Sequence, residues 1–250
     1  MPSNRLIRIQ YLEHSSFLCE TDHRLLLFDI GRIPARARDI DPDWDRLTAI
    51  GKPILLLSSH DHADHFDPAW QRLCEQTTGC RFIAGEFSRS GGNTIRVNPG
   101  EDRLIDDFRV YSVAATDKGI AVLLQFPEIT IYFGGDHAIW DDLPEFRKPY
   151  RTSMDRLARA GMKPDLAFLP VGTSDGWQED ALIEGCRLFM TRLAPHGVVP
   201  MHAHGYEEFY QSFFEKTADL GIPVAPIRHS GDCFDFNGSA FLPVLGTSVP

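Results

Sequence analysis

The segment with the densest chemistry in this chain is His60-Asp61-His62-Ala63-Asp64-His65, in which five of the six side chains are imidazoles or carboxylates. Neutral imidazole and carboxylate groups are good ligands for zinc, and also for iron or manganese. Because His60 and His62 are two residues apart, both can reach one ion from an extended or loop backbone. Asp64 and His65 can then reach a second ion. We therefore expect one or two divalent metal ions here, with zinc favoured.

A simpler interpretation of this segment is a polar turn that leads into a helix, since Asp67 can cap a helix with Pro68 at its first position. A single pair of histidines would favour that interpretation. A surface turn gains nothing from three histidines, however, so we favour the metal site. Such an ion lowers the pKa of a bound water towards ~7 and supplies a metal-bound hydroxide for attack on a carbonyl or phosphorus atom.

The periodicity of the apolar residues predicts the elements that position this segment. Residues 53–57 form an apolar run, typical of a buried strand, that ends just before the histidines. Other strands are expected at 5–11, 17–20, 24–30, 81–84, 108–114, 120–126, 129–133, 165–169, 197–201, 223–227 and 233–236, and helices at 43–50, 68–78, 153–160, 180–193 and 206–220. This alternation indicates an α/β fold. Since no linker interrupts it, we expect a single domain over residues 1–250.

Composition excludes several classes of protein. The formal net charge of -10 disfavours nucleic acid as a partner, because an acidic surface repels phosphate. The first residues are too polar for a signal peptide, and no apolar run approaches the ~20 residues that cross a membrane. A cytoplasmic protein without a membrane anchor is expected. The cysteines form no C-x-x-C pair, so we expect neither a disulfide framework nor a cysteine zinc site; they are Cys19, Cys74, Cys80, Cys186 and Cys233.

The His60–His65 segment resembles the signature of the metallo-β-lactamase superfamily, and the resemblance extends over most of the chain. It implies the fold of that family, an αββα sandwich of two mixed β-sheets flanked by helices. It also implies that Asp29 braces the metal loop, that Asp136 bridges two ions and that His202 is a late ligand. Outside the resemblance, Asp29 and Asp136 are equally typical of turns, and a histidine at a strand end is often structural.

Three further histidines have two interpretations each. His14 follows Glu13 in a stretch that resembles the Gly-His-Ser/Ala opening of the lactonase-like branch, with Glu13 in place of the glycine. It either lines the pocket or satisfies a loop. His137 and His204 adjoin or lie close to expected ligands, and they contact either substrate or solvent.

One departure from the family pattern concerns the first metal site. Many members have a histidine after the strand that corresponds to 108–114, whereas this chain continues Ala114-Ala115-Thr116-Asp117-Lys118-Gly119. Asp117, Thr116 or water would have to replace it. The first ion then has His60, His62 and Asp136 as ligands, and the second has Asp64, His65, Asp136 and His202. Since ligand number governs affinity, we expect the second site to bind more tightly.

The function that these observations favour is metal-dependent hydrolysis of a small ester, lactone, amide or phosphodiester. Asp64 would hold one ion and orient the nucleophile, which makes it the expected catalytic carboxylate. The alternatives are a di-iron protein that handles oxygen and a degenerate module that binds metal without turnover. A nuclease is disfavoured by the acidic charge, and the sequence carries no signal for the oligomeric state.

Overall fold

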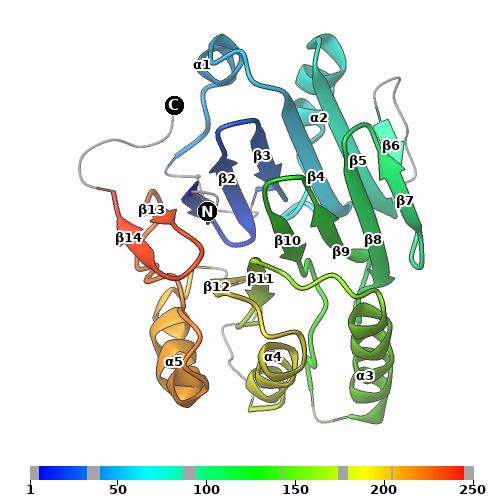
Figure 1. Ribbon diagram of the computed structural model, residues 1–250, viewed down its shortest axis with the longest axis vertical. Helices are drawn as coiled ribbons and strands as arrows, with labels where there is room; N and C mark the ends of the chain where they lie inside the picture. Colours follow the sequence, from blue (N-terminus) through cyan, green and yellow to red (C-terminus); the bar gives the residue numbers. More distant parts are fainter. Residues whose placement is uncertain are drawn as a thin grey trace.

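The computed structural model describes residues 6–32, 40–86, 94–141, 143–173, 180–203 and 205–244. Two β-sheets pack against each other, with helices on both outer sides (Figure 1). The described helices are α1 (Trp44–Ala49), α2 (Pro68–Gln76), α3 (Pro144–Arg159), α4 (Asp180–Leu193), α5 (Glu208–Thr217) and the short 3-10 turn Ala218–Leu220. This arrangement is the αββα sandwich of the metallo-β-lactamase fold, which confirms the expected class.

The first sheet has eight described strands in the order β14-β13-β1-β2-β3-β4-β5-β6. Its strands are β1 (Ile7–Glu13), β2 (Ser16–Glu20), β3 (Leu25–Phe28), β4 (Ile54–His60), β5 (Cys80–Glu86), β6 (Thr94–Arg96), β13 (Cys233–Phe236) and β14 (Phe241–Pro243). β3, β4, β5 and β6 run parallel. Every residue of β4 is buried, as expected for a parallel strand covered on both faces.

The second sheet has six described strands in the order β12-β11-β10-β9-β8-β7. They are β7 (Asp102–Ile105), β8 (Phe108–Ala114), β9 (Ile120–Gln125), β10 (Thr130–Phe133), β11 (Leu166–Pro170) and β12 (Gly197–Met201). β10, β11 and β12 run parallel, so their carboxyl ends share one edge.

Aromatic side chains fill the space between the sheets. Phe28 of β3 stacks on Phe133 of β10 with ring centroids 4.8 Å apart, and Phe17 of β2 meets Phe168 of β11 at 4.9 Å. These rings belong to one buried cluster with contributions from both sheets. A second cluster lies on the other face of the first sheet, where Leu47 of α1 and Trp70 of α2 cover it.

Some sequence-based boundaries were wrong. α3 begins at Pro144, well before the expected start at 153. Its first turns were not predicted because they are polar and contain Pro149. Residues 223–227 form no strand; Val224 makes only an isolated bridge with Val198. The short strands β6, β7 and β14 were not predicted, since three or four residues carry too little periodicity to register.

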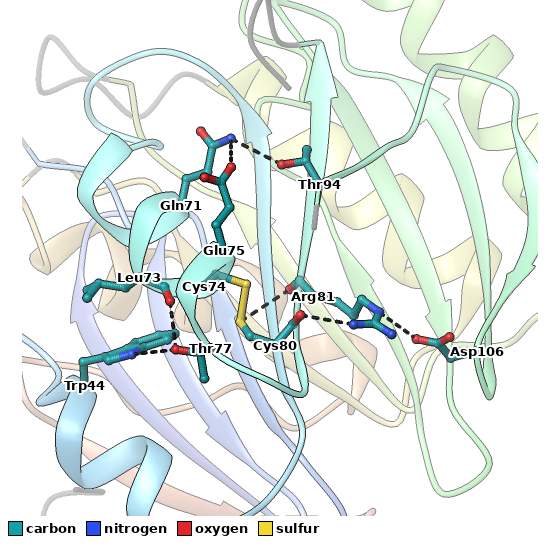
Figure 2. Close-up of a disulfide and its surroundings, with 10 residues drawn as sticks. All are labelled: Trp44, Gln71, Leu73, Cys74, Glu75, Thr77, Cys80, Arg81, Thr94 and Asp106. Carbon is teal, nitrogen blue, oxygen red and sulfur yellow. Dashed lines mark hydrogen bonds and ion pairs between the residues drawn. A yellow bond between two sulfur atoms is a disulfide. The ribbon is translucent and has the colours of Figure 1, made fainter. Parts of the chain in front are cut away.

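The expectation for the cysteines was also wrong at one place, because Cys74 and Cys80 form a disulfide with their Cα atoms 5.3 Å apart. Figure 2 shows the bond joining the last turn of α2 to the first residue of β5. The chain turns back within six residues, and this reversal, rather than a recognisable spacing, brings the thiols together. Within the described residues, Cys19, Cys186 and Cys233 form no disulfide.

Among the residues that the structure describes, no helix has the length and apolar character that crossing a membrane requires.

Gly31 lets the segment after β3 pack on the metal loop. A Cβ atom at this position would lie 2.1 Å from the backbone carbon of Asp64 and 2.3 Å from the amide nitrogen of His65. Only a residue without a side chain allows this approach.

We therefore expect Gly31→Ala to lower the free energy of unfolding by about 3 kcal/mol or more, since backbone has to move. Gly51→Ala is the control, because a Cβ there meets nothing within 4 Å and only its φ of 76° is unfavourable. Its cost should be about 1 kcal/mol. Urea unfolding of both variants without metal tests this, and equal losses would contradict it.

Candidate metal centre

The expected metal ligands, together with Asp29 and His14, gather at one edge of the sandwich, at or just beyond the carboxyl ends of strands. His60 is the last residue of β4, Asp29 follows β3, and Asp136 and His202 follow β10 and β12. His14 occupies the turn after β1. Ligand sites of α/β sheets form at such strand ends, because loops there are free to vary while the strands fix their origins.

The first set of donors, called the open group below, consists of His60, His62 and Asp136. The Nε2 atom of His60 lies 3.0 Å from Nδ1 of His62 and 3.3 Å from Oδ2 of Asp136. His62 is exposed, so this group faces solvent.

The second set, the buried group, consists of His14, Asp64, His65 and His202. Oδ2 of Asp64 lies 3.4 Å from Nε2 of His14 and 3.8 Å from Nε2 of His65. The other oxygen of Asp136, Oδ1, lies 3.3 Å from Nε2 of both His65 and His202. Asp136 therefore presents one oxygen to each group, as a bridging carboxylate requires.

These separations fit the coordination of metal ions. Ligand atoms ~2.0–2.1 Å from a tetrahedral zinc ion lie ~3.3 Å from one another. The three contacts of Asp136 with His60, His65 and His202 have this length. Furthermore, Nε2 of His65 and Oδ1 of Asp136 are buried with no hydrogen-bond partner among the described residues. Buried polar atoms nearly always have a partner, and a cation between these two would satisfy both.

Hydrogen bonds behind the imidazoles orient their Nε2 atoms toward the donor groups. Nδ1 of His65 lies 2.6 Å from Oδ2 of Asp29. Ser59 donates its hydroxyl proton to Asp29, so its Oγ accepts from Nδ1 of His60, 3.0 Å away. In the neutral form that binds metal, both rings would therefore keep their proton on Nδ1 and direct the Nε2 lone pair at the cluster. Asp29 lies where a brace of the metal loop should be.

The backbone is strained at this cluster. Five described residues other than glycine have positive φ angles, and three of them are His14 (54°), Asp29 (41°) and His202 (68°). Such conformations cost free energy and concentrate at functional sites, where the surrounding structure holds them. For His202, the carbonyl oxygen of Gly172 fixes Nδ1 at 2.9 Å.

Without metal, the cluster holds opposite charges in its interior. Burial lowers the pKa of His60 to about 3. Burial acts in the same direction on His65, but Asp136, Asp29 and Asp64 outweigh it and raise the pKa of this residue to about 10. The His65 imidazolium in turn holds the pKa of Asp136 well below its usual range, although burial alone would raise it. A divalent cation in this position would supply the positive charge that these carboxylates require.

His14 lies closer to the expected ligands than its sequence context indicated. Its ring centroid is 4.1 Å from that of His202 and 5.2 Å from that of His65. Burial holds its pKa well below the ordinary value, so the ring is neutral, which is the form that binds metal. The interpretation as a pocket residue is therefore the better one.

Asp117, in contrast, is exposed and belongs to neither donor group. Its neighbour Thr116 accepts from the amide of Ala138 at 2.8 Å and donates to the carbonyl of Asp136 or Ala138, so it fixes the backbone around the shared carboxylate. Thr116 was expected only as a possible replacement ligand, and Ser59 was not recognised in the sequence, because a serine or threonine carries no signal of its tertiary partners.

His137 is buried outside both donor groups. Its Nδ1 lies 2.6 Å from the hydroxyl of Tyr132, its ring stacks on Tyr150, and burial lowers its pKa to about 3. The expectation that His137 contacts solvent is therefore wrong, because its ring is 2% exposed and packs against two tyrosines. His204 lies outside the described residues, so its expected role stays a prediction.

Comparisons with known proteins agree with this geometry. No family model matches the chain. A UPF0173 metal-dependent hydrolase from Methanocorpusculum labreanum is 25% identical over 231 residues, which cover 86% of this chain and 92% of that protein.

Two solved structures share the fold. Igni18, a metallo hydrolase from Ignicoccus hospitalis, superposes with a TM-score of 0.65 at 21% identity and covers 92% of this chain and 98% of its own. YhfI from Bacillus subtilis, a metallo-β-lactamase fold protein, superposes with a TM-score of 0.57 at 11% identity, covering 92% and 99% of the two chains. The chain has the metallo-β-lactamase fold.

The chain has an unequal pair of donor groups. The open group offers three protein donors, since no histidine follows β8. The buried group offers four, and Oδ1 of Asp136 adds a fifth. A protein with this donor set should bind its two ions with different affinities.

We predict that His202→Ala abolishes the tighter of two metal sites, because it removes a donor of the buried group, and that His60→Ala mainly weakens the looser one. Calorimetric titration of the metal-free protein with zinc, with metal content measured in parallel, distinguishes the sites. A tight site that survives in His202→Ala but disappears in His60→Ala would reverse the assignment.

We also predict that chelation lowers the melting temperature. A ligand that binds only the folded state contributes about 2.7 kcal/mol at a hundred times its dissociation constant. Scanning calorimetry with chelator, and with chelator already saturated by metal as the control, measures the effect. Identical melting in both samples would show that no ion stabilises this protein.

Proposed function

We propose that the protein is a metal-dependent hydrolase that acts on a small ester, lactone, amide or phosphodiester. The observation that carries this proposal is the shared carboxylate of Asp136, with one oxygen in the open group and the other in the buried group. Such an arrangement suits two ions close enough to act on one substrate.

The two groups suit different tasks. The buried group, which has five donors with Asp136, leaves little room for a further ligand and suits an ion that stays in place. The open group, with three donors and the exposed His62, leaves coordination positions on its solvent side. Catalytic metal sites keep such an open position. An ion there would supply a water of lowered pKa and polarise the electrophilic group of the substrate.

Asp64 is the residue that we propose orients the attacking water. Burial alone would raise its pKa, but the neighbouring His14 and His65 hold its pKa below the usual range. The carboxylate is therefore ionised at neutral pH and accepts a hydrogen bond. In hydrolysis the water oxygen bonds to the electrophile, the bond to the leaving group breaks, and the leaving group takes up a proton. Asp64 fixes the direction of attack rather than storing that proton.

We propose that Trp140 forms a surface for a small organic substrate beside the metal centre. Its indole ring lies 5.0 Å from the ring of His202, and its Nε1 donates to the carbonyl of Asp136 at 3.2 Å. The half-buried ring offers a flat apolar surface next to the buried group.

The direct test is to load the metal-free protein with zinc, manganese or iron and to assay panels of lactones, esters, amides and phosphodiesters. Turnover of at least one class with a loaded metal, lost on chelation, supports the proposal. If no class is hydrolysed while the iron-loaded protein consumes oxygen, the oxygen-handling alternative holds instead.

We predict that Asp64→Ala lowers kcat by ~100-fold or more, the scale expected when a reacting group is misplaced. Asp61→Asn is the matched control from the same loop, because Asp61 pairs with Lys118 at the rim and belongs to neither donor group. That control should keep near-normal turnover. The assignment of Asp64 fails if Asp64→Ala keeps normal turnover at full metal occupancy.

A further inference from the structure

Two tyrosines lie behind the buried group, and the proposed reaction uses neither. Tyr11 belongs to β1 and Tyr210 to α5, and their rings meet edge to face with centroids 5.7 Å apart. Their exposed fractions are 0% and 2%. A buried hydroxyl is unfavourable unless it forms hydrogen bonds, so the bonds of these hydroxyls indicate their role.

The hydroxyl of Tyr11 connects His14 to α5. It accepts the backbone N–H of His14 at 2.8 Å and donates to Oε1 of Glu207 at 3.0 Å. Burial raises the pKa of the phenol well above its ordinary value, so the hydroxyl stays protonated as a donor.

The hydroxyl of Tyr210 connects the backbone at His14 with the backbone next to His202. It accepts the N–H of Ala203, the residue after His202, at 3.3 Å. Its own proton is directed at the carbonyl of His14 or the hydroxyl of Tyr11, each 3.3 Å away. The same carbonyl of His14 accepts the N–H of His202 at 3.0 Å. The peptide groups around the two histidines are thus held by each other and by the two phenols.

His14 and His202 need such support because both have left-handed backbones, with φ angles of 54° and 68°. Residues other than glycine keep this conformation only where the surroundings enforce it. The conformation places the two imidazoles with centroids 4.1 Å apart, on the same side of the buried group.

We propose that Tyr11 and Tyr210 are positioning residues of the metal centre: their hydroxyls hold the strained backbones of His14 and His202 so that both imidazoles address one ion. The proposal rests on the metal site of the proposed function. It also makes α5 part of the site, since this helix supplies Tyr210 and is preceded by Glu207.

The test compares Tyr210→Phe and Tyr11→Phe with Tyr150→Phe in the full chain. Tyr150 is an equally buried phenol that donates to the carbonyl of Gly185 and belongs to neither donor group. Zinc titration gives the affinity of each site, and the visible absorption of the cobalt-loaded protein reports ligand geometry. Melting of the metal-free variants measures the general loss of stability.

We expect Tyr210→Phe to weaken the tighter site by ~10-fold or more, the scale for partners that orient metal ligands, and to shift the cobalt spectrum. The looser site should be unchanged, and Tyr11→Phe should act in the same direction. Tyr150→Phe should lower the melting temperature of the metal-free protein without changing either affinity.

An unchanged tight site in both Tyr210→Phe and Tyr11→Phe would overturn the proposal. So would equal weakening of both sites in proportion to the fall in melting temperature, because that pattern indicates general destabilisation. A wild-type protein that binds no ion would instead overturn the proposed function itself, and this result appears before any variant is compared.

Discussion

Asp136 carries a carboxylate into the interior, where it is 5% exposed. It lies between three imidazoles: His60 at the end of β4, His65 in the loop after β4, and His202 after β12. Burying such a charge is costly unless opposite charge and hydrogen bonds compensate for it. His65 provides that charge when no metal is present, and a divalent ion would provide more of it. Much of the surrounding architecture follows from keeping this carboxylate compensated and accessible on one side.

Asp29 is a second buried carboxylate, and hydrogen bonds compensate for its burial as well. It is fully buried, accepts from the amide and hydroxyl of Ser59 at 2.7 Å each, and binds Nδ1 of His65. Its φ of 41° and the close approach of Gly31 to the metal loop show how much backbone geometry serves this contact. Asp29 follows β3 and holds the end of β4 and the loop after it through Ser59 and His65. The parallel pairing of β3 and β4 is therefore part of the metal centre.

The features that the sequence predicted well are those that depend on neighbouring residues in the chain. The density of ligands in His60–His65 and the apolar run before it required no tertiary information, and the family resemblance supplied Asp29, Asp136 and His202 and the sandwich fold. His14 remained ambiguous, because its left-handed turn and its contact with His202 arise only when β1 and β12 are brought together. The Cys74–Cys80 bond and the early start of α3 likewise depend on a chain reversal and on packing that periodicity does not record. The expectation of one domain over residues 1–250 stays a prediction.

The central claim is that Asp136 joins two unequal metal sites, and a crystal structure of the zinc-loaded protein with anomalous scattering data tests it most directly. Two anomalous peaks are expected, one among His60, His62 and Oδ2 of Asp136, and a stronger one among the buried group and Oδ1 of Asp136. Peaks remote from Asp136, or a single peak held by His60 and His62 alone, would contradict it.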